Sequence, residues 1–189
     1  MATFFGAGIL FISEDNRSVL SGFHPKFNRW SGFGGKRRNN EEALETAVRE
    51  VIEEVFGVFN PSEECILELS SCIQSIPKNN SDYMLYIESE SRLFEMAYIL
   101  HSNNYISPYY LTLPKNSFEL NRFRQLKEEM EITRIDYFLI KELQDKRGLI
   151  TKEFYSDIQK YIILTSPQEY IDDTALFIKF LDDMGVSEI

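Results

Sequence analysis

The feature that most constrains this chain is a set of acidic residues at helical spacing, placed shortly after a glycine-rich segment. Glu50, Glu53 and Glu54 fall within one narrow stripe of an α-helix, because each residue turns a helix by about 100°. Carboxylates so close together repel one another unless a cation lies on them. The spacing therefore predicts a helix with a cation-binding acidic stripe.

The residues around the stripe also predict a helix. Apolar residues recur at steps of three and four and form a face that can pack on a core: Leu44, Ala47, Val48, Val51 and Val55. Asn39 is the predicted N-cap, with Glu42 completing a capping box, and Gly57 is the predicted C-terminal stop. The glycines within 32–35 are expected to form a tight loop that brings backbone carbonyl groups close to a bound ion.

Divalent-cation binding is the chemistry that suits this arrangement. Mg²⁺ and Mn²⁺ prefer hard oxygen ligands and are typically held by a few carboxylates together with substrate phosphates. An ion of this kind polarises a phosphoryl group and lowers the pKa of a bound water. The predicted reaction is attack of metal-activated water on a phosphoanhydride. The alternative interpretation is a surface helix rich in solvated glutamates.

The segment resembles the Nudix box, whose pattern is G-x5-E-x7-R-E-U-x-E-E-x-G-U, where U is a bulky aliphatic residue. The matching residues are Gly35, Glu41, Arg49, Glu50, Val51, Glu53 and Glu54. The match loosens after Glu54, because the next glycine of the pattern arrives one residue late, at Gly57.

This resemblance implies a Nudix hydrolase, a pyrophosphatase that depends on Mg²⁺ or Mn²⁺. The metal ligands that it implies are Glu50, Glu53, Glu54 and the backbone carbonyl of Gly35. One of the three glutamates would also orient or deprotonate the attacking water. Arg49 would hold a neighbouring glutamate in place, and Glu41 would support the geometry of loop and helix.

A further acidic residue lies downstream. Members of the family often place an acidic residue about six positions before an aromatic residue, here Tyr137, where it serves as a metal ligand or as the general base. Glu131 fits that offset, and Glu128 and Glu129 are nearby competitors. The alternative is that these residues are charges of a variable loop.

Basic residues gather before the acidic helix, where they could meet the phosphates of a substrate: His24, Lys26, Arg29, Lys36, Arg37 and Arg38. Of these, Arg29, Lys36, Arg37 and Arg38 are the predicted substrate-binding residues. The alternative is that they are solvated charges that balance an acidic surface. Trp30 is either a core residue or a substrate contact.

We expect an α/β fold: a Nudix-like α/β/α sandwich with a mixed β-sheet, in which the box loop and helix carry the metal site. The predicted strands are residues 3–12, 18–23, 65–76, 94–100 and 130–139, and the predicted later helices are residues 151–164 and 174–184. Residues 1–164 would form one domain, on which a helical extension, residues 165–189, packs.

Composition limits the partners and the compartment. A net charge of −10 opposes affinity for nucleic acid or anionic membranes, and no apolar stretch is long enough to span a bilayer. Cys65 and Cys72 lack the spacing of a metal site and indicate a reduced, intracellular protein. We therefore expect a cytoplasmic protein, in the host cytoplasm if the chain is viral.

The box leaves the substrate open. We expect a nucleoside diphosphate linked to another moiety, and the candidates are nucleoside triphosphates, ADP-ribose-like sugars, dinucleoside polyphosphates, diphosphoinositol phosphates and capped RNA. One alternative is a viral-type mRNA decapping enzyme, which the start of the box at Gly34-Gly35-Lys36 resembles. Another is a non-catalytic Nudix-like module that senses a nucleotide or contacts a protein.

Overall fold

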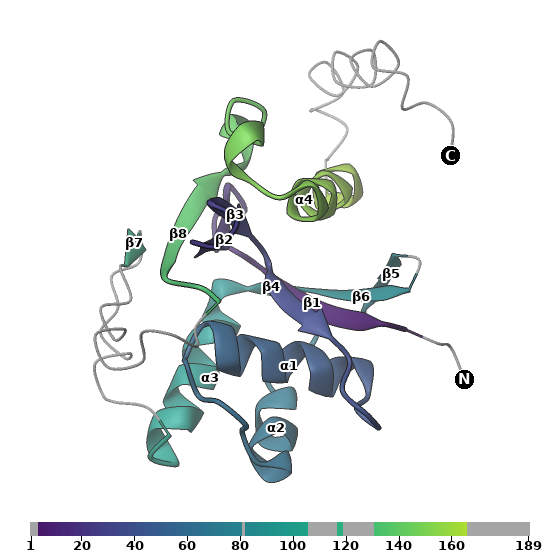
Figure 1. Cartoon of the computed structure of the whole chain (residues 1–189), viewed down its shortest axis with the longest axis vertical. Coiled ribbons are helices and arrows are strands. Elements are labelled where there is room, and N and C mark those ends of the chain that lie inside the picture. The colour runs from purple at the N-terminus through teal and green to yellow at the C-terminus, as the bar shows by residue number, and fades with distance from the viewer. Residues whose placement is uncertain (1–3, 81, 106–116, 119–130, 166–189) are drawn as a thin grey trace.

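The computed structural model describes residues 4–80, 82–105, 117–118 and 131–165 (Figure 1). Its strands are β1 (Gly6–Ile12), β2 (Ser18–His24), β3 (Arg29–Ser31), β4 (Phe33–Lys36), β5 (Lys78–Asn80), β6 (Tyr83–Ser89), β7 (Ser117–Phe118) and β8 (Arg134–Leu139). Its helices are α1 (Ala43–Glu54), α2 (Glu63–Ser70), α3 (Glu90–Ser102) and α4 (Lys152–Thr165), with short 3₁₀ turns at Ile140–Glu142 and Arg147–Leu149.

The strands form one mixed sheet in the order β5-β6-β1-β2-β8-β7, with β3 added to β2 and β4 added to β1. β1 runs parallel to β6 along its whole length and antiparallel to its other partners. On the side away from β6, β4 pairs with β1 from Gly6 to Ile9, and β2 pairs with it at Ile12. Two strands therefore share this edge of β1: β4 lies along its first part and β2 pairs at its last residue.

Helices cover both faces of this sheet, because the side chains of β1 alternate between two apolar cores. Ala7, Ile9 and Phe11 belong to a core that includes residues of α1, α2 and α3. Leu10 and Ile12 belong to a second core, on the opposite face, that includes residues of α4. Figure 1 shows α1, α2 and α3 on one side of the strands and α4 on the other. The predicted α/β fold with a mixed sheet between helices is confirmed.

Glycine residues allow β4 and β1 to approach closely. Gly8 pairs with Gly34, and an added Cβ at Gly8 would collide with the carbonyl oxygen of Phe33 and with the hydroxyl of Tyr83. The predicted glycine loop is therefore wrong over residues 33–36, which form a strand. A side chain larger than hydrogen would separate β4 from β1.

Two predicted strands, residues 65–76 and 94–100, are also wrong, because α2 includes residues 65–70 and α3 includes all of residues 94–100. Each helix follows a serine whose hydroxyl accepts a backbone N–H bond: Ser62 from Cys65 at 3.2 Å, and Ser89 from Ser91 at 3.3 Å. The buried residues of both helices recur at helical spacing: Cys65, Ile66 and Leu69 in α2, and Leu93, Met96, Ala97 and Leu100 in α3. Burial of one helical face thus outweighs the strand preference of these apolar residues.

The remaining predicted elements are confirmed or lie outside the described residues, and one strand was missed. The first hairpin, the strand before residue 139 and the helix after residue 151 are confirmed as β1–β2, β8 and α4. β6 was not predicted, although it is the parallel partner of β1. The predicted helix at 174–184 lies outside the described residues, and the domain division at residue 164 stays a prediction. None of the helices in the described part of the chain has the length and apolar character that a membrane crossing requires.

The substitution Gly8→Ala should destabilise the protein by about 1–3 kcal/mol, because its Cβ would overlap backbone atoms that cannot rotate away. Urea unfolding measures the change in the free energy of unfolding. Gly148→Ala is the matched control, since an added Cβ there meets no atom within 4 Å, and it should change stability by at most about 0.5 kcal/mol. Equal effects of the two substitutions would contradict the close packing of β4 on β1.

Candidate active site

The acidic helix α1 begins at Ala43, later than predicted. Glu42 is its N-cap, and the backbone N–H of Glu42 donates to the Glu45 carboxylate at 2.8 Å. The predicted N-cap Asn39 is therefore wrong. Asn40 adopts a left-handed conformation (φ 68°), so the chain turns once more before the helix starts.

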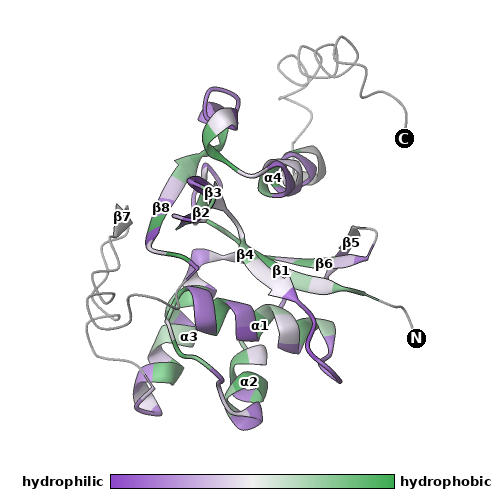
Figure 2. Ribbon diagram, viewed as in Figure 1, coloured by the Kyte–Doolittle hydropathy of each residue, from purple (hydrophilic) through white to green (hydrophobic). Residues whose placement is uncertain are grey.

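α1 packs on the sheet by its apolar face and ends at a glycine. Ala47, Val48 and Val51 are fully buried, and Figure 2 shows hydrophobic and hydrophilic residues alternating along the helix. Gly57 has φ 66°, and its N–H donates to the Glu53 carbonyl at 3.1 Å. The predicted stop at Gly57 is confirmed, and the displaced glycine still closes the helix after the glutamates.

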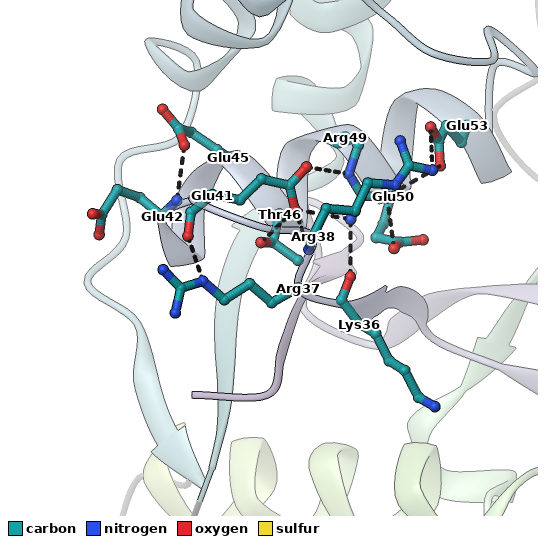
Figure 3. Close-up of polar contacts among 10 residues, drawn as sticks. All are labelled: Lys36, Arg37, Arg38, Glu41, Glu42, Glu45, Thr46, Arg49, Glu50 and Glu53. Carbon is teal, nitrogen blue, oxygen red and sulfur yellow. Dashed lines mark hydrogen bonds and ion pairs between the residues drawn. The ribbon is translucent and has the colours of Figure 1, made fainter. Parts of the chain in front are cut away.

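Arg49 connects the acidic stripe to the rest of the site (Figure 3). Its side chain is 2% exposed, and it donates to both carboxylate oxygens of Glu41, at 2.5 and 3.1 Å. It also donates to the carboxylates of Glu50 (2.8 Å) and Glu53 (3.1 Å) and to the backbone carbonyl of Lys36 (3.0 Å). One guanidinium thus fixes three carboxylates relative to the end of β4.

Glu41 completes this arrangement from the loop before α1. Its carboxylate also accepts hydrogen bonds from the Thr46 hydroxyl at 3.0 Å and from the Arg38 backbone N–H at 2.9 Å. Burial opposes the ionised form, but the hydrogen bonds from Arg49, Arg38 and Thr46 prevail and lower the pKa of Glu41. Thr46 is fully buried, and it was not predicted as a site residue because only its contact with Glu41 distinguishes it from a core threonine.

Glu50 and Glu54 lie in surroundings that disfavour their ionised forms. Burial raises the pKa of Glu50, although Arg49 opposes the shift. Burial, and then repulsion by Glu50, raise the pKa of Glu54 well above its ordinary value, although its carboxylate accepts the Gly34 N–H at 2.9 Å. A Cβ added at Gly35 would lie 2.5 Å from the Glu50 carboxyl carbon, so only glycine leaves room for this carboxylate beside β4.

The third glutamate of the stripe, Glu53, lies at the solvent boundary between two arginines. It accepts from the buried Arg49 and also from Arg38, whose Nη2 lies 3.0 Å from each Glu53 oxygen. The side chain of Glu53 is 13% exposed, whereas that of Arg38 is 50% exposed. Arg38 is therefore the solvent-facing partner of Glu53.

The other predicted basic residues are arranged differently. The side chain of Lys36 is exposed and extends away from the carboxylates in Figure 3. Arg37 donates to the Glu41 carbonyl at 2.7 Å and lies over the ring of Phe4. Arg29, in β3, donates instead to the Ile150 carbonyl at 3.3 Å.

The predicted downstream residue Glu131 is exposed and lies close enough to the stripe that its charge contributes to the raised pKa of Glu54. It also acts on His24, whose pKa is lowered by burial against the opposing effect of Glu131. Its competitors Glu128 and Glu129 lie outside the described residues. The structure thus brings Glu131 toward the box carboxylates.

Trp30 packs as a core residue. Its ring lies 5.2 Å from that of Phe23 and 5.2 Å from that of Phe138, measured between centroids, and it contacts the apolar core beneath α4. Tyr83, which was not predicted, lies under β4 with its hydroxyl against Gly34. It comes from β6, and its position depends on sheet pairing that no local pattern indicates.

The donor chemistry of the site fits a hard divalent cation. Glu50, Glu53 and Glu54 supply carboxylate oxygens, and burial, the main cause of the raised pKa values of Glu50 and Glu54, disfavours their ionised forms unless a cation lies beside them. Among the described residues, however, no three acidic, histidine or cysteine side chains converge as a metal-binding group. The Glu50 and Glu53 carboxylates face arginines instead.

Comparison with solved structures gives distant similarities. The chain resembles a hydrolase of the NUDIX family from Clostridium perfringens (16% identity, TM-score 0.41, covering 88% of this chain and 100% of that one). It also resembles a NUDIX hydrolase from Nitrosomonas europaea (13%, 0.42, 84% and 88%) and a C. elegans Ap4A hydrolase in a binary complex (13%, 0.41, 84% and 95%). No protein-family profile and no curated protein sequence matches the chain. At these scores the functional proposal rests on the site residues.

Replacing Arg49 with Met should cost about 3–5 kcal/mol of stability, because it leaves several partly buried carboxylates without their shared counter-ion. Thermal or urea unfolding provides the measurement. Arg92→Met, which breaks the exposed Arg92–Glu95 pair, is the control and should leave the unfolding midpoint almost unchanged. Similar losses of stability in both variants would mean that the buried Arg49 network stabilises the fold no more than an exposed ion pair does.

Replacing Glu54 with Gln should stabilise the chelator-treated protein near neutral pH by about 1–3 kcal/mol, because it removes a buried charge and keeps an acceptor for the Gly34 N–H. Since the pKa is raised in the folded state, the gain should decrease as the pH falls through that pKa. It should vanish below the ordinary glutamate value of 4.5, where the folded and unfolded forms are both protonated. Urea unfolding across pH measures this. Glu63→Gln, which removes an exposed carboxylate, should show no such pH dependence.

Proposed function

We propose that this protein is a Nudix-type hydrolase that depends on Mg²⁺ or Mn²⁺ and cleaves a phosphoanhydride bond in a nucleoside diphosphate linked to another moiety. The observation that carries the proposal is the Arg49 network. A buried guanidinium holds Glu41, Glu50 and Glu53 beside a glycine strand, at the spacing of the Nudix box. A solvated surface helix would not require a buried arginine with five hydrogen bonds to carboxylates and a backbone carbonyl.

The proposed roles follow from where each group lies. Glu50, Glu53, Glu54 and the Gly35 carbonyl would hold the cation, and Glu131, whose charge acts on Glu54, would add a carboxylate or accept a proton from water. The bound cation would polarise the phosphoryl group and lower the pKa of the attacking water. Arg49 and Glu41 would keep the glutamates in fixed rotamers, as groups behind metal ligands generally do.

The basic loop would contact the phosphates of the substrate. Lys36, at the end of β4, and Arg37 and Arg38, which follow it, occupy consecutive exposed positions before α1. Their charge would neutralise phosphate oxygens that the cation does not reach. Arg29, in contrast, would contact only a substrate that extends toward β3.

The substitution Glu53→Gln should lower Mg²⁺-dependent phosphate release by about 100-fold or more, because a neutral amide is a poor ligand for a hard cation. Turnover is measured with and without a chelator. Glu45→Gln is the control on the same helix, since glutamine keeps an acceptor for the Glu42 N–H and Glu45 does not contact Arg49. Unchanged turnover of Glu53→Gln with an intact fold would refute the mechanism.

The substrate itself is identified by a panel assay. Nucleoside triphosphates, ADP-ribose, dinucleoside polyphosphates, diphosphoinositol phosphates and capped RNA are incubated with Mg²⁺ or Mn²⁺, and the products are identified by mass spectrometry. Selective hydrolysis of capped RNA would favour a decapping enzyme. Binding of a nucleotide without turnover of any substrate would favour a sensor, although sensors often lose box carboxylates that this chain retains.

A further inference from the structure

Two arginines hold the same glutamate, but they differ in burial. Arg49 is 2% exposed and makes four contacts besides the one with Glu53. Arg38 is 50% exposed, and it pairs with Glu53 at 3.0 Å to each carboxylate oxygen, while its charge also acts on Glu50. Displacing Arg49 would leave buried carboxylates unpaired, whereas displacing Arg38 breaks one exposed ion pair, which contributes little to stability.

Arg38 occupies both oxygens of a carboxylate that, under the proposed function, must bind a cation. The Arg38 guanidinium therefore competes with a divalent ion for both Glu53 oxygens, whereas Arg49 contacts only one of them. A substrate phosphate is the alternative partner for Arg38, because its side chain is half exposed and two further exposed basic residues, Lys36 and Arg37, precede it. A released Arg38 would present a planar guanidinium, which binds phosphate oxygens well.

We infer that Arg38 is an exchangeable counter-ion: it holds Glu53 in the metal-free protein and leaves when a divalent cation binds, which frees it to bind a substrate phosphate. The inference rests on the proposed function, since it assumes that Glu53 is a metal ligand. It assigns Arg38 a positioning role that couples cation binding to phosphate binding. Arg49 stays on Glu53 in both states and keeps its rotamer.

The first test measures Mn²⁺ affinity in the full chain without substrate, by electron paramagnetic resonance of free Mn²⁺. Arg38→Gln should bind Mn²⁺ about five-fold or more tightly than the wild type, because the competing cation is gone. Arg37→Gln is the matched control: it removes the same charge from the adjacent residue, but Arg37 contacts a backbone carbonyl and not Glu53. An equal gain in both variants, or no gain in Arg38→Gln, would overturn the inference.

A double-mutant cycle tests whether Glu53 is the shared group. In a Glu53→Gln background, Arg38→Gln should change Mn²⁺ affinity much less, because the contested carboxylate is absent and only the effect of the Arg38 charge on Glu50 remains. A gain of the same size in that background would show that Arg38 acts through the general field and would overturn the inference.

Phosphate binding provides a further readout. With inorganic phosphate as the probe at fixed free Mn²⁺, the metal should strengthen phosphate binding more in the wild type than in Arg38→Gln, and an equal gain would count against the inference. Wild-type protein that binds Mn²⁺ but hydrolyses nothing in the panel would refute only the proposed function. Wild-type protein that binds no Mn²⁺ would refute both.

Discussion

The site depends on the burial of one guanidinium among several carboxylates. Arg49 extends from the apolar side of α1 toward the end of β4, where it meets Glu41, Glu50 and Glu53. Burying such a charge is costly unless hydrogen bonds satisfy it, and here its donors are directed at carboxylates and at the Lys36 carbonyl. The network therefore joins helix, loop and strand, and each glutamate takes its position from the same central group.

The glycines of β1 and β4 make this arrangement possible from the side of the sheet, opposite α1. Because Gly8 and Gly34 have no side chains, β4 lies close to β1 and to Tyr83. Gly35 leaves room for the Glu50 carboxylate, and the Gly34 N–H reaches Glu54. The strand thus provides both space and one hydrogen-bond donor, whereas the repulsion between Glu50 and Glu54 remains. A cation bound between these carboxylates would relieve this repulsion.

The parts of the fold that follow from local patterns were predictable from sequence, and those that depend on distant pairing were not. The box helix, the first hairpin and the end at Gly57 follow from spacing and from glycine, so nearby residues determine them. The segments that form α2 and α3 are short and apolar, so their composition favours strands. Their helical spacing is supported by the serine caps Ser62 and Ser89, whose hydrogen bonds are visible only in the structure. β6 and Tyr83 enter the site through parallel pairing with β1, for which the local sequence gives no signal.

In the candidate site, too, some features follow from the local sequence and others do not. Helical spacing predicted the acidic stripe, whereas Arg49 and Glu131 were predicted from the resemblance to the Nudix family; the charge of Glu131 acts on Glu54. The spacing could not show that Arg49 is buried and Arg38 exposed, because both arginines lie in a segment rich in charged residues of both signs. That difference in burial determines which ion pair is permanent and which can exchange. Glu53 lies at the boundary between the two, held from inside by Arg49 and from outside by Arg38, so the availability of its carboxylate depends on the weaker, solvent-facing contact.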